Sequence, residues 1–96
     1  MPPAFEWDWR KARENLRKHR VSFAEAVSVF GDPLARIFVD EDHSIWEPRE
    51  IIIGHSAPRR LLLVCYTEPA KDRIRIISAR RATKREQHDY EQYVTR

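Results

Sequence analysis

The chain has 96 residues, of which 42% are hydrophobic and 34% are charged, and its formal net charge is +3. A chain of this size and composition can bury one core, which excludes a second domain and a disordered chain, so we expect one domain over residues 1–96. The single cysteine, Cys65, excludes an intramolecular disulfide, and no stretch reaches the roughly 20 apolar residues of a membrane span. The N-terminus lacks a signal-peptide pattern, so we expect a cytoplasmic protein with no membrane partner.

The first predicted element is a helix that begins after the capping residue Asp8 and runs to about His19. The helix should pack through an apolar stripe formed by Trp9, Ala12 and Leu16. Asn15 lies on its polar side. The residue after the helix is Arg20, where a left-handed conformation suits Gly better, and such a conformation costs Arg about 1 kcal/mol.

A second helix is predicted between Ser22, which forms a capping box with Glu25, and the stop signal GDP at 31–33. The residues expected on its buried stripe are Phe23, Ala26, Val27 and Phe30. Another capping box, formed by Thr83 and Glu86, predicts a last helix near the C-terminus. One stripe of this last helix comprises Ala82, Glu86, Tyr90 and Tyr93.

Four strands are predicted between the second and the last helix, at 34–40, 50–56, 61–67 and 73–79. The short connections at 57–60 and 68–72 favour antiparallel neighbours. The run LLLVCYT at 61–67 is apolar without alternation, so it should be a central strand with both faces covered. The expected fold class is therefore α+β, with two N-terminal helices, a four-stranded, mainly antiparallel sheet and a C-terminal helix.

The most distinctive segment is RIRIISARRATKRE at 73–86, where a strand that alternates Arg with Ile runs into the capped helix. Arg73 and Arg75 should project from one face of this strand, and Ile74 and Ile76 from the other. Six of these fourteen residues are Arg or Lys, and guanidinium groups at fixed positions are suited to holding phosphate oxygens. The segment predicts a phosphodiester partner, and a solvated basic face is the simpler alternative.

Several kinds of site are excluded by spacing. The four His and Cys65 show no metal-ligand spacing, and the two Gly form no phosphate-binding loop, so we expect neither a metal nor a cofactor. RNA cleavage by attack of the 2′-hydroxyl on its neighbouring phosphate needs a proton acceptor, a proton donor and positive charge. The candidates of these types are Lys18, His19, Arg75, Arg80 and Tyr90. Each also has a plainer structural explanation, such as a core aromatic for Tyr90.

The chain resembles the BrnT family of bacterial type II toxins over nearly its whole length. The motifs that carry this resemblance are FEWDWRKARENLRKH at 5–19, VSFAEA at 21–26, FGDP at 30–33, and RIISARRATKRE at 75–86 with Tyr90 behind it. The resemblance implies a fold related to the RelE and ParE toxins and a ribonuclease that inhibits translation. It also implies neutralisation by a BrnA-like ribbon-helix-helix antitoxin, and contact with promoter DNA only through the antitoxin complex. The chain departs from the expected pattern at Arg20, where Gly is expected.

Carried over by motif position, the resemblance points to Lys18, His19, Arg75, Ser78, Arg80, Glu86 and Tyr90. We therefore predict a metal-independent endoribonuclease whose substrate is RNA, free or on the ribosome. The cations expected to hold the flanking RNA backbone are Arg49, Arg73, Arg81 and Lys84. Two alternatives stay open: a non-catalytic, ParE-like inhibitor that binds a protein such as a topoisomerase, and a basic surface that serves mainly the antitoxin and promoter complex.

Overall fold

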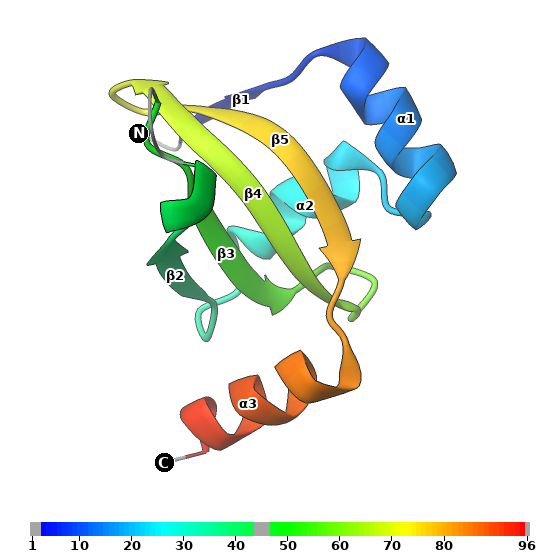
Figure 1. Cartoon of the computed structure of the whole chain (residues 1–96), viewed down its shortest axis with the longest axis vertical. Helices are drawn as coiled ribbons and strands as arrows, with labels where there is room; N and C mark the ends of the chain where they lie inside the picture. Colours follow the sequence, from blue (N-terminus) through cyan, green and yellow to red (C-terminus); the bar gives the residue numbers. More distant parts are fainter. Residues whose placement is uncertain (1–2, 44–46, 96) are drawn as a thin grey trace.

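The computed structural model describes residues 3–43 and 47–95. In chain order, its elements are β1 (Ala4–Glu6), α1 (Trp9–His19), α2 (Phe23–Val29), β2 (Arg36–Val39), the 3-10 helix η1 (Glu41–His43), β3 (Glu50–His55), β4 (Leu61–Ala70), β5 (Arg73–Arg81) and α3 (Lys84–Val94). The strands form one sheet in the order β1-β5-β4-β3-β2. Helix α2 lies behind this sheet, α1 lies beyond β5, and α3 lies at one end (Figure 1).

The α+β class and the antiparallel order of the last four strands are confirmed, and β4 is the central strand as predicted. The prediction of four strands is wrong, because β1 adds a fifth, parallel to β5. Three residues are too few to show an alternating pattern, so β1 left no signal in the sequence. The strand pairs Phe5 with Ile74, and the Phe5 ring packs edge-on against Phe30 with centroids 5.1 Å apart.

The predicted loop at 68–72 is also wrong. Strand β4 continues to Ala70, and the turn comprises only Lys71 and Asp72, with Asp72 in the left-handed region at φ 61. Asp tolerates this conformation better than most residues. A register irregularity between Thr67 and Ala70 lets the strand pass through Pro69, because a proline is accepted where the ladder is interrupted.

The main core lies between the sheet and α2. Its buried members are Val21, Phe23, Ala26, Val29, Ile52, Leu62, Val64, Tyr66, Ile74, Ile76 and Ala79. Phe23 and Ala26 are buried as predicted, whereas Val27 and Phe30 are only partly buried and Val29 is fully buried instead. We call this side of the sheet the α2 face and the opposite side, toward the viewer in Figure 1, the open face.

The predicted packing stripe of α1 is wrong for two of its three residues, since only Ala12 packs against the main core. Trp9 is 62% exposed and Leu16 is 50% exposed, whereas Asn15 is buried. The Asn15 amide donates to the Ala79 carbonyl (2.8 Å), and its oxygen accepts from the Ala79 N–H (3.0 Å). Because β1 pairs with β5 only as far as Arg75, the backbone groups further along that edge need other partners, and Asn15 supplies them at Ala79.

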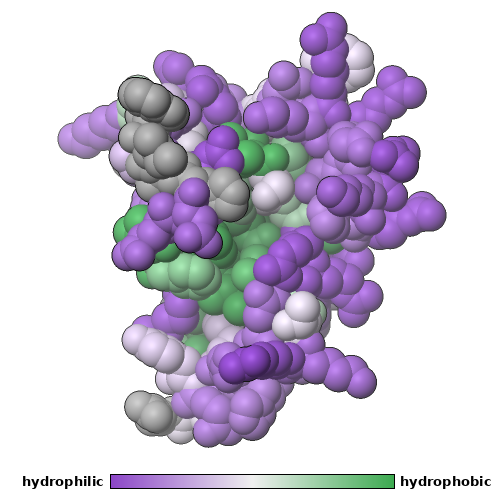
Figure 2. All heavy atoms as spheres, in the orientation of Figure 1, coloured by the Kyte–Doolittle hydropathy of each residue, from purple (hydrophilic) through white to green (hydrophobic). Residues whose placement is uncertain are grey.

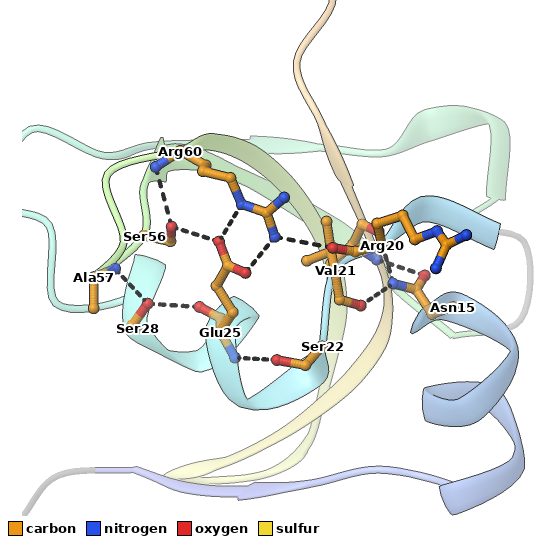
Figure 3. Close-up of polar contacts among 10 residues, drawn as sticks. Asn15, Arg20, Val21, Ser22, Glu25, Ser28, Ser56, Ala57 and Arg60 are labelled. Atoms are coloured by element: carbon orange, nitrogen blue, oxygen red, sulfur yellow. Dashed lines mark hydrogen bonds and ion pairs between the residues drawn. The ribbon is translucent and has the colours of Figure 1, made fainter. Parts of the chain in front are cut away.

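A second polar network fixes the junction between α1 and α2 (Figure 3). Arg20 has the predicted left-handed conformation, with φ 60. Ser22 caps α2 by accepting from the Glu25 N–H (3.0 Å), but Glu25 does not complete the predicted capping box. Its carboxylate instead accepts from the Arg60 guanidinium and from the Ser56 hydroxyl (2.7 Å). Glu25 therefore joins α2 to the turn between β3 and β4.

The last helix forms as predicted from its cap. The Thr83 side chain accepts from the Glu86 N–H and the Glu86 carboxylate accepts from the Thr83 N–H, which completes the capping box. Of the predicted stripe, Tyr90 is buried against Ile53 and Leu63 on the open face, whereas Tyr93 is 60% exposed. Helix α3 thus covers one end of the open face.

Candidate functional site

A bulge in β5 decides which side chains meet on the open face. Cys65 pairs with Ser78 while Tyr66 pairs with Ile76, so Ile77 is an extra residue in the strand. Strict alternation would put Arg75 and Arg80 on opposite faces. The bulge shifts the pattern by one position, so Ile76 and Ala79 both reach the α2 core while Arg75, Ser78 and Arg80 share the open face.

A pocket of about 360 Å³ opens on this face. Its lining residues are His19, Asp40, Arg49, Ile51, Leu63, Cys65, Ser78, Ala79 and Arg80. The floor of the pocket is apolar and includes Ile51 and Leu63. Figure 2 shows the hydrophobic strip to which this floor belongs, and hydrophilic side chains border the strip on the side where α1 lies. The pocket therefore combines an apolar floor with a cationic border.

His19 reaches the pocket because α1 ends at the edge of β5. The Asn15 amide lies one turn earlier in the helix and holds the backbone of Ala79. The same amide donates to the Val21 carbonyl (2.9 Å), so it also secures the chain just after His19. The helix end is thereby fixed beside Ser78 and Arg80 on β5, and His19 is placed at the border of the pocket.

Arg80 is held rigidly by Glu86. Two guanidinium nitrogens donate to the two carboxylate oxygens, each at 2.8 Å. The Arg80 hydrogen bonds, together with the Thr83 N–H, lower the pKa of Glu86 to about 2, and the pair also raises the pKa of Arg80. Glu86 is thus both the cap of α3 and the residue that orients Arg80.

Arg73 and Arg75 lie on the open face beyond the pocket, where both are paired. Glu6 of β1 accepts from Arg75 (2.8 Å) and from Arg73 (2.7 Å), and the Arg75 hydrogen bond is the main cause of a lowered Glu6 pKa. Arg75 also lies 3.9 Å from Glu47. The predicted cation cluster is therefore partly neutralised by β1.

The structure does not bring the remaining predicted residues into the pocket. Tyr90 donates its hydroxyl to the Leu34 carbonyl (3.2 Å), and burial raises the pKa of this phenol, so it stays protonated in the groove beside α3. Arg81 pairs with Leu62 in the ladder, which puts it on the α2 face, where its charge helps to lower the pKa of Glu25. Lys18 and Lys84 are exposed on their helices and do not line the pocket.

The sequence interpretation missed Asp40 in the pocket and Asn15 beneath His19. Asp40 follows β2, and its N–H donates to the Arg49 carbonyl (2.8 Å), so the pairing of β2 with β3 brings both residues to the pocket. Cys65 also lines it, and burial followed by the Asp40 charge raises the pKa of its thiol, which disfavours a reactive thiolate. No sequence pattern pointed to either Asn15 or Asp40.

The pocket offers an imidazole, a hydroxyl and two guanidinium groups around an apolar floor, and Glu86 orients the guanidinium of Arg80. Such groups can move a proton and stabilise a developing oxyanion. Within residues 3–43 and 47–95, no group of three or more His, Cys, Asp or Glu could hold a metal ion. None of the described helices is long and apolar enough to cross a membrane.

Comparison with known protein families identifies the chain. The family model described as "Ribonuclease toxin, BrnT, of type II toxin-antitoxin system" matches residues 7–86. The chain belongs to the BrnT family. A solved relative is the ribonuclease toxin BrnT of Brucella abortus, which is 21% identical, with a TM-score of 0.66, and the match covers 85% of this chain and 99% of that one. The comparison with curated protein sequences gives no match.

The segment that matches the BrnT family model contains both elements that bring His19, Ser78 and Arg80 together. Residues 7–86 contain α1 with His19 and β5 with Ser78 and Arg80, and they end at Glu86. Most of α3, including Tyr90, lies beyond the matched segment. The Brucella structure is similar in fold to the α+β arrangement of this chain.

Proposed function

We propose that this BrnT-family chain is a metal-independent endoribonuclease that cleaves RNA and thereby inhibits translation. The observation that carries the proposal is the pocket in which the end of α1 and the bulged part of β5 bring His19 next to Ser78 and Arg80. The family of ribonuclease toxins supplies the substrate class. We also propose the wider fold relation to the RelE and ParE toxins and a cytoplasmic site of action.

In the proposed reaction, the His19 imidazole accepts the proton of a 2′-hydroxyl, because imidazole is the side chain that exchanges protons near neutral pH. The 2′ oxygen forms a bond to the adjacent phosphorus, and the bond from phosphorus to the 5′ oxygen breaks. Solvent, or Lys18, which is exposed next to His19 at the end of α1, returns a proton to the departing 5′ oxygen. The products are a 2′,3′-cyclic phosphate and a free 5′-hydroxyl.

Arg80 stabilises the negative charge that builds on the phosphate during this attack. Its guanidinium is already oriented by the two Glu86 oxygens, so little rearrangement is needed when the charge develops. Arg49 lines the opposite border of the pocket, where it can contact the same or the next phosphate. Ile51 and Leu63 provide an apolar surface for a nucleobase. Arg73, Arg75 and Lys84 are proposed contacts to the flanking RNA backbone.

Membership in a type II toxin family implies an antitoxin partner. We propose that this partner is a BrnA-like ribbon-helix-helix protein and that an acidic segment of it covers the open face around Arg80. Its DNA-binding part brings the complex to promoter DNA, which the toxin itself does not contact.

A substrate with one 2′-deoxy residue at the cleavage position tests the proposal directly. The purified chain should cut the all-ribose oligonucleotide and leave the deoxy version intact, while it binds both with similar affinity, because only the 2′-hydroxyl acts as nucleophile. Cleavage should also continue in EDTA. The His19→Ala variant is the control for a contaminating ribonuclease.

Three results would contradict the proposal. Cutting at the deoxy position makes water the nucleophile, and loss of cutting in EDTA makes the reaction metal-dependent. Intact RNA at high enzyme concentration, combined with growth arrest in cells, supports the ParE-like alternative of an inhibitor that only binds its target.

A further inference from the structure

The solvent-facing side of α1 carries a high density of positive charge. Residues 10–20 contain six Arg or Lys and one acidic residue, Glu14, so their net charge is +5, whereas the net charge of the whole chain is +3. All six cations are exposed. Figure 2 shows hydrophilic side chains projecting from the side of the molecule where α1 lies. One helix therefore presents to solvent more positive charge than the chain has in total.

The cations of α1 are less neutralised than those of β5. Segment 73–86 has the same net charge as residues 10–20, but Glu6 and Glu86 bind three of its arginines. On α1, the only ion pair within the described residues joins Glu14 to Arg17. The positive charge of α1 is therefore available to an anionic partner.

The stability of the helix does not explain these cations. The helix macrodipole favours acidic residues in the first turn, but the first turn of α1 contains Arg10 and Lys11 and no acidic residue. Arg13 lies four residues before Arg17, which lies three residues before Arg20. Like charges at these spacings are neighbours on a helix and repel each other. Such a conflict with local stability is typical of a functional surface.

Arg20 adds a second conflict of this kind. It has a left-handed backbone with φ 60 and ψ 31, which glycine would adopt without strain. Its N–H donates to the Leu16 carbonyl (3.0 Å) and its carbonyl accepts from Arg60 (3.0 Å). Its guanidinium has no hydrogen bond or ion pair with the described residues. Figure 3 shows the side chain directed away from the network of Glu25 and Arg60, toward α1. No contact within the described chain offsets the strain, which points to a role outside it.

We propose that the outer side of α1 binds the phosphate backbone of the RNA substrate where the strand leaves the pocket. We call this side the α1 cationic surface, and its residues are Lys11, Arg13, Arg17, Lys18 and Arg20. The inference rests on the proposed function, because it takes RNA as the substrate. His19 lies on the same helix and lines the pocket, so a strand seated in the pocket has α1 at its border.

The dimensions of the helix suit one strand of RNA. The α1 cationic surface extends from Lys11 to Arg20, which corresponds to about 14 Å along a helix. A helix with its side chains is only about 10–12 Å across. Long side chains on both flanks of α1 can therefore reach phosphates of the same strand, and guanidinium and ammonium groups are the usual ligands of phosphate.

An exposed aromatic residue favours RNA over an acidic protein as the occupant. Trp9 begins α1 and is 62% exposed. The Arg10 guanidinium carbon lies 5.2 Å from the centre of the Trp9 ring, so Arg10 is engaged there and is not part of the α1 cationic surface. Proteins that bind single-stranded nucleic acid combine cations along the backbone with aromatic rings on which bases stack. Trp9 and the cations of α1 provide both.

The binding of an RNA that cannot be cleaved tests the proposal. The probe is a fluorescent oligonucleotide of about 16 nucleotides with 2′-O-methyl groups throughout, so no 2′-hydroxyl can attack. Each lost phosphate contact lowers the slope of log K against log salt by about 0.7 and weakens binding about fivefold at 0.1 M salt. The triple variant Lys11→Gln, Arg13→Gln, Arg20→Asn should therefore bind about a hundredfold more weakly, with a slope lower by about 2. Lys18 is kept because of its proposed role in cleavage.

Arg59 provides a matched control for Arg20. It lies between β3 and β4, is exposed, and is also left-handed, with φ 68. Asparagine tolerates this conformation better than arginine, so Arg20→Asn and Arg59→Asn should each leave the melting temperature unchanged or higher. Both variants lose one positive charge. Arg20→Asn alone should weaken binding of the probe about fivefold, and Arg59→Asn should bind it like wild type.

The probe separates this inference from the proposed function, because its binding does not depend on cleavage. A chain that cleaves no RNA, but whose triple variant loses the probe as expected, supports the α1 cationic surface and contradicts the ribonuclease. Three outcomes would overturn the inference. The triple variant binds the probe like wild type, or Arg20→Asn and Arg59→Asn weaken binding equally, which makes total charge the cause. In the third, the triple variant keeps the probe but no longer binds the antitoxin, which assigns the surface to that protein.

Discussion

Replacing Asn15 by alanine should destabilise the protein strongly, although the residue lies in a helix whose neighbouring side chains are mostly exposed. The Asn15 amide serves three backbone groups: the Ala79 N–H, the Ala79 carbonyl and the Val21 carbonyl. The residue is only 6% exposed. A buried polar group left without a partner costs about 1–3 kcal/mol, so the alanine variant should lose roughly 3 kcal/mol of unfolding free energy.

This loss can be measured by urea denaturation at neutral pH. For a domain of this size, it corresponds to a melting temperature lower by roughly 12–20 °C. The matched control is Glu14→Ala, one position earlier in α1, where Glu14 only binds Arg17 on the surface. That variant should change stability by less than about 0.5 kcal/mol. A loss for Asn15→Ala as small as the control's would refute the argument that this amide clamps α1 to β5.

The Asn15→Asp variant tests in which direction the stability of the protein changes with pH when a carboxylate replaces the amide. An aspartate here keeps an acceptor for the Ala79 N–H but turns its charge toward the two carbonyl oxygens that Asn15 now serves. Burial and these oxygens should raise its folded-state pKa above the unfolded value of about 3.9. Stability should therefore be highest below the unfolded pKa and fall as the pH rises through the folded one. A variant equally stable at pH 4 and pH 8 would contradict this reasoning.

Three further predictions concern the pocket and the sheet. Glu86→Gln should lower the free energy of unfolding by about 1 kcal/mol above pH 4.5, because the Arg80 hydrogen bonds lower the pKa of Glu86 to about 2. Denaturation at a series of pH values should show that this difference between variant and wild type disappears as the pH falls toward 2. Arg80→Ala should lower RNA cleavage about a hundredfold, whereas Arg10→Ala, far from the pocket, should match wild type in the same assay. Gly54→Ala should lower the free energy of unfolding by about 1–3 kcal/mol, because its Cβ would lie 2.8 Å from Ala35 and 3.0 Å from Asp32. A melting temperature equal to that of wild type would show that these two side chains move to make room for the Cβ.

Local signals in the sequence predicted most of the elements, because caps and turns depend on residues close together in the chain. The Thr83 and Glu86 box starts α3, Asp8 and Ser22 start the first two helices, and Arg20 takes its left-handed conformation as expected. The alternation of Arg and Ile at 73–76 correctly predicted which side of β5 faces the core. Among the site residues, His19, Ser78, Arg49 and Arg80 were named from the sequence and line one pocket.

Features that depend on distant partners could not be predicted in this way. The sequence classed Asn15 as polar and exposed, but the free edge of β5 needs hydrogen-bonding partners, and only the docked helix shows that Asn15 supplies them. Likewise Glu25 suited a capping box, yet Arg60, 35 positions later, binds its carboxylate. A short strand such as β1 has too few residues for a pattern and exists only because β5 lies beside it.

The bulge at Ile77 shows most clearly what the tertiary structure decided. The sequence by itself determined that β5 carries arginines on one side and isoleucines on the other at its start. Residues 73–81 contain no glycine or proline to indicate a bulge, and strict alternation separates Arg75 from Arg80. The α2 core requires both Ile76 and Ala79 to be buried, three positions apart, and the strand can satisfy this only with an extra residue. Packing against a distant helix therefore placed Arg80 on the same face as Arg75.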